Sequence, residues 1–367
     1  MLAWMAVTVA GGWLLPRNWQ IWWPVVCTAV FLGVYSPNSL FLMLVTTLLV
    51  GFAAINLRGS AVALLSSVFA CFVLLIIYRA LIDLSGLMDG ALLLGFAFYI
   101  LRAIHFLLDC YRGRIQAVDW KMFIAWFWFL PTLQVGPIHR FDAFSRDLSR
   151  RRWDSELFEK GLRRIMYGYA KVVLLGNYLV GVKLVDMIAA LDSGSWVYHY
   201  LDTFRYGLLL YLRFSGYSDI AIGFALLLGF RVMENFNLPF LASNIVDFWR
   251  RWHISLSSWC KDYVYIPVLS FTRVPLLAAL ASMTVLGIWH EMSWRYLLWG
   301  AFHGAGIAVC QRWQRTEMAK SLADNRVWGL AALMITQHFV LFSFTLTGLD
   351  SMQETFARWH VLFGLTP

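Results

Sequence analysis

Two histidines in this sequence have the residue type and the surroundings to move protons. His290 ends an apolar run in ASMTVLGIWHEMSW, and no lysine or arginine lies between Arg273 and Arg295. His253 lies in FWRRWHISLS, where charged residues stand among tryptophans. Because the unperturbed pKa of imidazole is about 6.5, histidine can accept and return a proton at neutral pH, as a general base that activates a hydroxyl must. The alternative is that each histidine only hydrogen-bonds a neighbouring helix.

The stretch 247–267, DFWRRWHISLSSWCKDYVYIP, concentrates charge in an otherwise apolar chain and supplies groups that could bind a polar substrate. The candidate substrate-binding residues are Trp249, Arg250, Arg251, Ser257, Asp262, Trp289 and Asp219. Of these, Trp249, Arg250, Ser257 and Trp289 are candidate donors to an oxyanion. Two alternatives stay open. The arginine pair could anchor an interfacial helix, and the small residues around Asp219 equally indicate close helix packing.

The elements that position these residues are predicted to be membrane helices. Hydrophobic residues make up 60% of the 367 residues and charged residues only 14%, against about a quarter in soluble domains. The mean hydropathy is +0.65. We expect an all-α polytopic membrane protein, a single membrane-embedded domain over residues 1–367, with about ten transmembrane helices plus re-entrant or interfacial ones. The expected spans are 20–35, 39–57, 61–79, 87–109, 120–138, 165–190, 203–230, 274–290, 293–311 and 327–348.

Charge in the loops predicts the orientation of these helices. The interval 139–164 carries eight Lys or Arg and 312–326 is also basic, whereas 191–195 carries none. The positive-inside rule places both basic intervals in the cytoplasm and 191–195 outside, so that 247–267 lies at the inner face or dips into the membrane from it. The run Arg150–Arg152 could attract an acidic donor carrier, although a topology anchor is the favoured interpretation.

Several other classes of function find no support. The net charge of +9 lies in short loops between apolar runs, which argues against nucleic-acid binding. The five cysteines are odd in number and widely spaced, so that neither a disulfide framework nor a metal site is indicated. They are Cys27, Cys71, Cys110, Cys260 and Cys310. The N-terminus lacks the features of a cleaved signal peptide, and we expect it to stay in the fold. The sequence holds no GxSxG elbow.

Four segments resemble the membrane-bound O-acyltransferase family in sequence, order and spacing. They are FLPTLQVGPIHRF (129–141), FSGYSDIAIGFALLLGFRVMENFNLPF (214–240), IVDFWRRWHISLSSWCKDYVYIP (245–267) and GIWHEMSWRYLLWGAFHG (287–304). The resemblance covers about 96–309 and is strongest to the bacterial branch that includes alginate O-acetyltransferases and the teichoic acid D-alanyl transferase.

The resemblance implies transfer of an acyl group, such as acetyl, from a cytoplasmic thioester donor to a hydroxyl of an extracytoplasmic glycan. The donor would be acyl-CoA or an acyl carrier protein, with no bound cofactor and no metal, in the inner (cytoplasmic) membrane. The family's catalytic histidine falls on His290, and the WRRWHIS histidine falls on His253. The sequence departs from the family pattern directly after His290: the family usually has a small residue there, whereas this chain has Glu291 and Met292. These differences put the identity of the acceptor in doubt.

Two rival functions remain. The protein could act as an acyl relay that hands its group to a separate extracytoplasmic transferase. A polytopic transporter would also have about ten spans, but its sequence mark would be inverted repeats, and the sequence shows no such symmetry.

Overall fold

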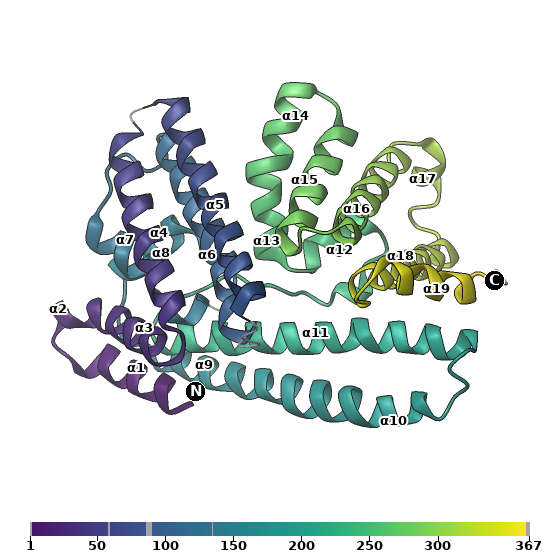
Figure 1. The fold of residues 1–367 in the computed structure, drawn as a ribbon, viewed down its shortest axis with the longest axis horizontal. Helices are drawn as coiled ribbons and strands as arrows, with labels where there is room; N and C mark the ends of the chain where they lie inside the picture. Colours follow the sequence, from purple (N-terminus) through teal and green to yellow (C-terminus); the bar gives the residue numbers. More distant parts are fainter. Residues whose placement is uncertain (1, 58, 86–89, 134, 365–367) are drawn as a thin grey trace. The chain divides into compact units, whose positions relative to one another are not determined.

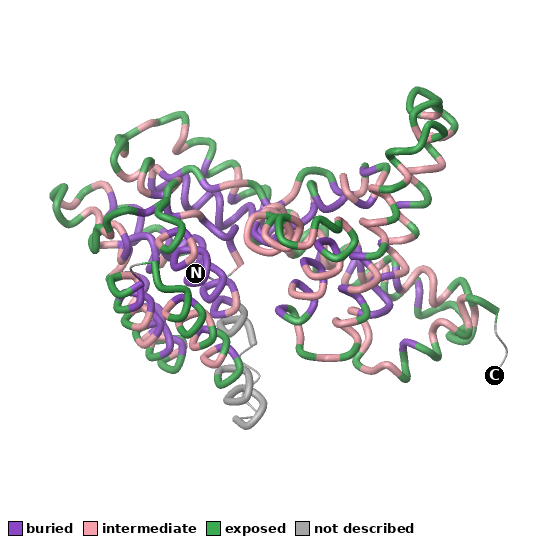
Figure 2. Tube along the Cα trace, turned by 90° about the horizontal axis from the view of Figure 1, so that it is seen from above, coloured by how far each residue is buried: buried purple, intermediate pink, exposed green. Residues whose placement is uncertain are grey.

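The computed structural model describes residues 2–57, 59–85, 90–133 and 135–364, and it contains helices and loops but no strand in these ranges (Figure 1). The all-helical prediction is therefore confirmed. By internal contacts the chain divides into two compact units, Met1–Tyr167 with Tyr217–Met233, and Gly168–Gly216 with Glu234–Pro367. We call these unit 1 and unit 2. Within each unit the buried residues gather on the facing sides of the helices, while the outer sides are exposed (Figure 2).

Unit 1 is built from the N-terminal helices. Its elements are α1 Leu2–Leu14, α2 Arg17–Gln20, α3 Trp22–Tyr35, α4 Pro37–Asn56, α5 Ala61–Ser85, α6 Gly90–Tyr111, α7 Trp120–Phe127, η1 Leu130–Thr132, α8 Phe141–Ser149 and most of α9 Ser155–Tyr169. Aromatic side chains fill its core, among them Phe106, Phe123 and Trp126, whose ring centroids lie 4.8–6.4 Å apart. Such aromatic pairs contribute beyond the area they bury.

Unit 2 holds the C-terminal helices and with them most of the candidate site residues. Its elements are η2 Ala170–Lys183, α10 Leu184–Ala189, η3 Pro239–Leu241, α12 Ile245–Arg251, α13 Ile254–Cys260, η4 Lys261–Tyr265, α14 Ile266–Thr272, α15 Pro275–His290, α16 Trp294–Trp313, α17 Glu317–Ser321, α18 Arg326–Thr347 and α19 Met352–Leu362. Helix α11, Trp196–Leu227, contributes its first part to unit 2 and its last part to unit 1.

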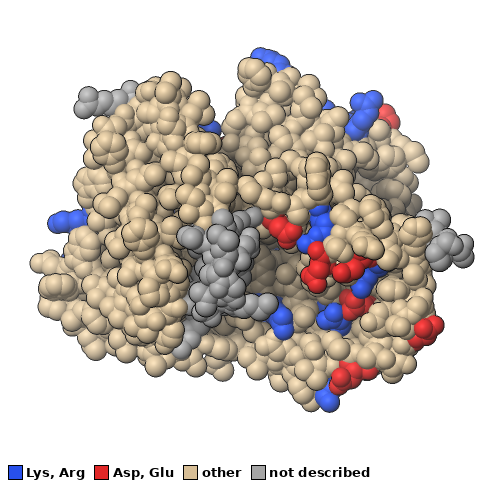
Figure 3. Space-filling model, viewed as in Figure 1, with Lys and Arg blue, Asp and Glu red and all other residues tan. Residues whose placement is uncertain are grey.

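Three helical segments are long and apolar enough to cross a membrane: Pro37–Asn56, Ser155–Ala189 and Arg326–Thr347. Four shorter apolar helices accompany them: Leu2–Leu14, Trp22–Tyr35, Ala61–Ile77 and Pro275–His290. Among the described residues the expected spans are thus helical for the most part, and three of them are long and apolar enough to cross a membrane; the number of ten transmembrane helices stays a prediction. On the face drawn in Figure 3 most side chains are uncharged; acidic and basic side chains gather in one mixed group, and others lie scattered toward the margins.

One expected span is wrong and another begins earlier than expected. The segment 120–138 is not one helix, because α7 ends at Phe127 and the chain turns through η1, where Pro131 lacks an amide donor. The span expected at 165–190 belongs to a 35-residue helix that starts at Ser155. Asp154 allows this early start, since its carboxylate accepts from the amide of Leu157 at 3.0 Å.

Candidate active site

His290 is the last residue of α15 and lies exposed among aromatic rings. Its ring centroid lies 4.7 Å from that of Trp289, and 5.8 Å from those of both Tyr296 and Trp299. Tyr296 and Trp299 are on the first turns of α16, directly after the α15–α16 turn. The imidazole is therefore confined by three aromatic neighbours and still reachable from outside the protein.

His253 lies in the tight turn between α12 and α13 and is buried, with 2% of its surface exposed. Its edge packs on Phe214 at 4.6 Å between centroids, and Trp289 lies 6.5 Å away. Burial, and to a smaller extent nearby His290, lower the pKa of His253 well below its usual range. The two histidines therefore share Trp289 as a neighbour, one buried and neutral and the other exposed.

The turn at His253 is held by a loop that contains Asn235. His253 has a φ of +44°, in the left-handed region that costs a non-glycine residue about 1–2 kcal/mol. Asn235, fully buried, spans the turn: its carbonyl accepts from Ile254 N at 2.9 Å, and its Oδ1 accepts from Ser255 Oγ at 2.6 Å and Ser255 N at 3.4 Å. Asn235 is therefore the residue that fixes this backbone conformation.

The hairpin of α15 and α16 sets the position of His290. Its two helices pack so closely that a Cβ added to Gly287 would lie 2.2 Å from the carbonyl oxygen of Tyr296. A Cβ on Gly300 would likewise lie 2.5 Å from Met283 O. Only glycine permits this approach, as at the small-residue interfaces of membrane helices. The short turn begins with Glu291, and Ser293 caps α16 by accepting from the amide of Tyr296.

Trp249 is buried on α12 and donates its indole N–H to His303 Nδ1 at 3.3 Å. His303 is buried on α16 and also packs on Trp299, with centroids 4.8 Å apart. Trp299 in turn contacts His290. A continuous row of aromatic rings, Trp249, His303 and Trp299, therefore connects α12 to His290. The indole N–H of Trp249 is engaged by His303 within the protein.

The remaining predicted site residues have other surroundings. Arg250 is exposed, and Arg251 pairs with Asp247 on its own helix at 2.8 Å. Ser257 Oγ donates to backbone carbonyls of the preceding turn, the shortest being His253 O at 3.2 Å. Asp262 is half-buried in η4. Asp219 belongs to unit 1, where it pairs with Arg164 at 2.5 Å.

The structure therefore brings together His253, Trp289 and His290 from the predicted set. Sequence reasoning did not identify Asn235 as the residue that holds the His253 turn, nor His303 as the acceptor of the Trp249 indole N–H. The partner of His303 is 54 positions away in the chain, so no local pattern could reveal the pair. Glu291, whose carboxylate was a possible influence on His290, pairs with Arg295 at 3.2 Å.

Chemically, the arrangement offers an accessible imidazole beside a buried neutral one, in an apolar aromatic setting. Among the described residues no group of three His, Cys, Asp or Glu side chains lies close enough to hold a metal ion. The five cysteines are free thiols. Fold and composition together define a helical membrane protein with a histidine-bearing site.

The comparisons with known proteins agree with that class. A family model described as MBOAT, membrane-bound O-acyltransferase family, matches residues 34–349. The chain therefore belongs to the membrane-bound O-acyltransferase family, as the four motifs predicted.

Three relatives illustrate the similarity. A probable alginate O-acetylase of Azotobacter vinelandii is 36% identical over 256 residues, which are 68% of this chain and 50% of the relative. The teichoic acid D-alanyltransferase of Bacillus subtilis is 28% identical over 270 residues, 68% of this chain and 67% of the relative. The peptidoglycan O-acetyltransferase of Helicobacter pylori is 33% identical over 199 residues, 52% and 37% respectively. The chain spans about half the length of most of the alginate O-acetylases it matches.

Proposed function

We propose that this protein is an O-acyltransferase that moves a short acyl group from a cytoplasmic thioester to a hydroxyl of an extracytoplasmic glycan. Family membership and the names of the relatives, which act on alginate, teichoic acid and peptidoglycan, support the reaction class and the kind of acceptor. The observation that carries the assignment to residues is the gathering of His253, Trp289 and exposed His290 at the end of α15.

In the proposed reaction His290 acts as the general base. The acceptor hydroxyl loses its proton to the imidazole while its oxygen bonds to the thioester carbonyl carbon. The carbon–sulfur bond then breaks, the acyl group stays on the acceptor oxygen, and the thiolate leaves and takes the proton back from His290. Because a thiolate is a good leaving group, the step needs neither an acyl-enzyme intermediate nor a further co-reactant.

The tetrahedral intermediate carries an oxyanion that requires donors. Of the four candidate donors, Trp249 already donates its indole N–H to His303, and Ser257 already donates its hydroxyl to backbone carbonyls. We therefore assign the role to Arg250 or Trp289. Because burial keeps His253 neutral, we assign this histidine a positioning role beneath His290 rather than that of the base.

The donor in this proposal is acyl-CoA or an acyl carrier protein, and the enzyme lies in the inner membrane with its basic intervals 139–164 and 312–326 in the cytoplasm. These intervals would attract an acidic carrier to the inner surface. A relay to a separate extracytoplasmic transferase is the second candidate: the nucleophile that His290 deprotonates would then belong to that partner protein rather than to glycan.

The test uses the full chain in proteoliposomes with a radiolabelled acetyl thioester and candidate glycans. Wild type should label the glycan, and His290→Ala should lower the rate by at least about a hundredfold at equal folded protein, as loss of a general base does. His253→Gln should keep a larger part of the rate. Full transfer by His290→Ala would refute the assignment of the base, and label that reaches glycan only after a second protein is added would favour the relay.

A further inference from the structure

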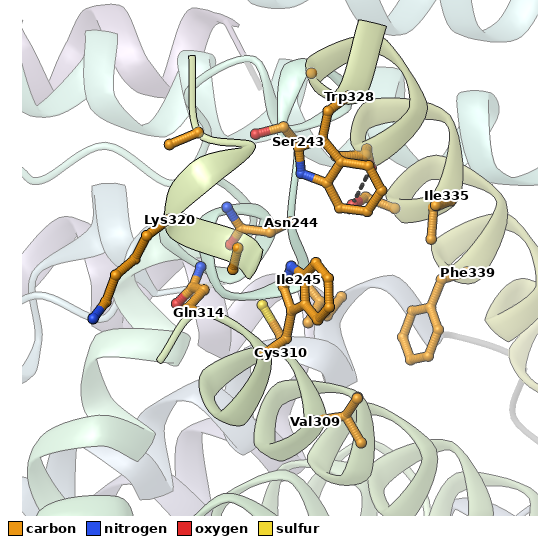
Figure 4. Close-up of a pocket in the computed structure, with 17 residues that line it drawn as sticks. Ser243, Asn244, Ile245, Val309, Cys310, Gln314, Lys320, Trp328, Ile335 and Phe339 are labelled. Carbon is orange, nitrogen blue, oxygen red and sulfur yellow. Dashed lines mark hydrogen bonds between the residues drawn. The ribbon is translucent and has the colours of Figure 1, made fainter. Parts of the chain in front are cut away.

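A cavity lies in unit 2, and none of the residues assigned to the chemical step of acyl transfer lines it. Its volume is about 660 Å³, within the usual range for small-molecule sites. The walls come from the start of α12, the second half of α16, α17 and the first half of α18 (Figure 4). Two rim residues, Val309 and Ile335, are 69% and 61% exposed, so that the cavity opens to the surroundings of the protein.

Polar and apolar groups occupy opposite sides of this cavity. Lys320 and Gln314 lie on one side, next to the capping residue Asn244 (Figure 4). Ile335 and Phe339 lie on the other side, and the wall between consists mainly of aliphatic and aromatic carbon. A site with one polar and one apolar end fits an amphiphile rather than a fully polar or fully apolar molecule.

The chain segment that supplies the polar side of the cavity is basic, and Lys320 is its charged residue that lines this cavity. The segment 312–326 contains four Lys or Arg (Arg312, Arg315, Lys320, Arg326) and two acidic residues (Glu317, Asp324), a net of +2. Arg312 and Arg315 line an adjoining cavity of about 580 Å³ that shares Val309 with the first. Lys320 is itself held by Glu317 at 2.6 Å, on the protein surface. An anionic head group at this end would therefore lie beside Lys320, with Arg312 and Arg315 in the adjoining cavity.

We propose that this cavity binds an anionic phospholipid of the surrounding bilayer, with acyl chain between α16 and α18 and phosphate beside Lys320. Basic pockets between membrane helices bind acidic head groups by this combination of charge and apolar area. The cavity opens through apolar side chains, which in a membrane face lipid. Asn244, in the wall, caps α12 by accepting from Asp247 N at 2.8 Å, so that the lipid contacts the segment leading to Trp249.

The test measures lipid binding to the purified full chain by native mass spectrometry, independent of acyl transfer. Phosphatidylglycerol and phosphatidylcholine with identical chains are the two probes. Wild type should bind phosphatidylglycerol more tightly. Lys320→Gln should weaken that preference about fivefold, as expected for one surface cation. Glu317→Gln should strengthen it, because this change releases Lys320. Lys160→Gln, an exposed lysine of unit 1, is the matched control and should change nothing.

The apolar end is tested by filling it. Gly329 lines the cavity and a Cβ on it would meet no atom within 4 Å, so that Gly329→Phe is the first plug. This variant, with Ala332→Phe as a second plug, should bind less of both lipids at an unchanged melting temperature. Equal binding of the two lipids by wild type, unchanged binding by both plugs, or displacement of phosphatidylglycerol by acetyl-coenzyme A would each overturn the proposal.

Discussion

Replacing Asn235 by alanine isolates the interaction that holds His253. The change removes an acceptor used by Ser255 Oγ at 2.6 Å and, more weakly, by Ser255 N at 3.4 Å, all of these groups being buried. A buried donor left without its acceptor costs about 1–3 kcal/mol, so that two such donors should lower the free energy of unfolding by about 2–4 kcal/mol. The backbone bond from Ile254 N to Asn235 O survives the substitution.

The same substitution should also slow the proposed acyl transfer, because it changes the backbone conformation at His253. His253 keeps its left-handed conformation only because surrounding contacts outweigh the strain. Once Asn235 no longer bonds Ser255, the turn can relax. The buried imidazole of His253 then shifts relative to Trp289 and His290. We expect acyl transfer to fall about 10–100-fold, which is the effect of a misplacement of about 1 Å.

The assays are thermal unfolding of the purified protein and labelled acyl transfer in proteoliposomes, normalised to folded protein. Asn237→Ala is the matched control, because that exposed residue bonds Arg251 through its backbone, which the substitution keeps. Its amide donates to Arg251 O at 2.9 Å, and its carbonyl accepts from Arg251 Nη1 at 3.5 Å. If Asn235 acts through His253, the double variant with His253→Gln should lose no more activity than His253→Gln alone. Fully additive losses, or an Asn235→Ala protein with normal stability, would refute the reasoning.

Three further predictions concern stability. Gly287→Ala should lower the free energy of unfolding by about 1–3 kcal/mol, since its Cβ would meet a backbone carbonyl of α16 at 2.2 Å; denaturant unfolding measures this. Trp249→Phe should cost about 1–3 kcal/mol by leaving buried His303 without its donor, measured in the same way. Burial, with nearby cationic groups, lowers the pKa of His139 to about 3 in the folded protein. As the pH falls below about 6.5, His139 is therefore protonated in the unfolded chain but not in the folded one. Stability should therefore drop by about 1.4 kcal/mol per pH unit between those values, and His139→Gln should reduce that slope in thermal melts.

Outcomes that contradict these expectations are equally specific. A Gly287→Ala protein as stable as wild type would mean that the hairpin tolerates a wider separation. Trp249→Phe without effect would show that His303 finds another donor. A pH slope that is the same in His139→Gln and wild type would assign the acid sensitivity to other groups.

Much of the fold could be predicted from the sequence because membrane helices follow from apolar length. Nine of the ten expected spans coincide with helices among the described residues, and α4 and α18 match within one or two residues at each end. The exception, 120–138, is apolar enough for a span, but its hydrophobicity reports burial in the aromatic core of unit 1 rather than contact with lipid. Hydropathy alone cannot distinguish those two surroundings.

Less of the site could be predicted. The motifs pointed to His290 and His253, and the structure gathers these two around Trp289, but their catalytic and positioning roles stay predictions. Asp219 lies in one of the four family-like segments, 214–240, and yet belongs to the other unit, paired with Arg164. A motif reports which residues are present, whereas the pairing of side chains from distant segments depends on how helices pack.

The contrast between the two histidines follows from the backbone that carries each. His290 ends a helix in which Gly287 lets α16 approach closely, and it is exposed at that end while the preceding Trp289 is buried. His253 sits instead in a strained turn clamped by Asn235, and its burial lowers its pKa. One ring is thus exposed at a helix end, and the other is buried in a turn and neutral. If a general base operates here, this difference in exposure favours His290 on physical grounds, independent of the family resemblance.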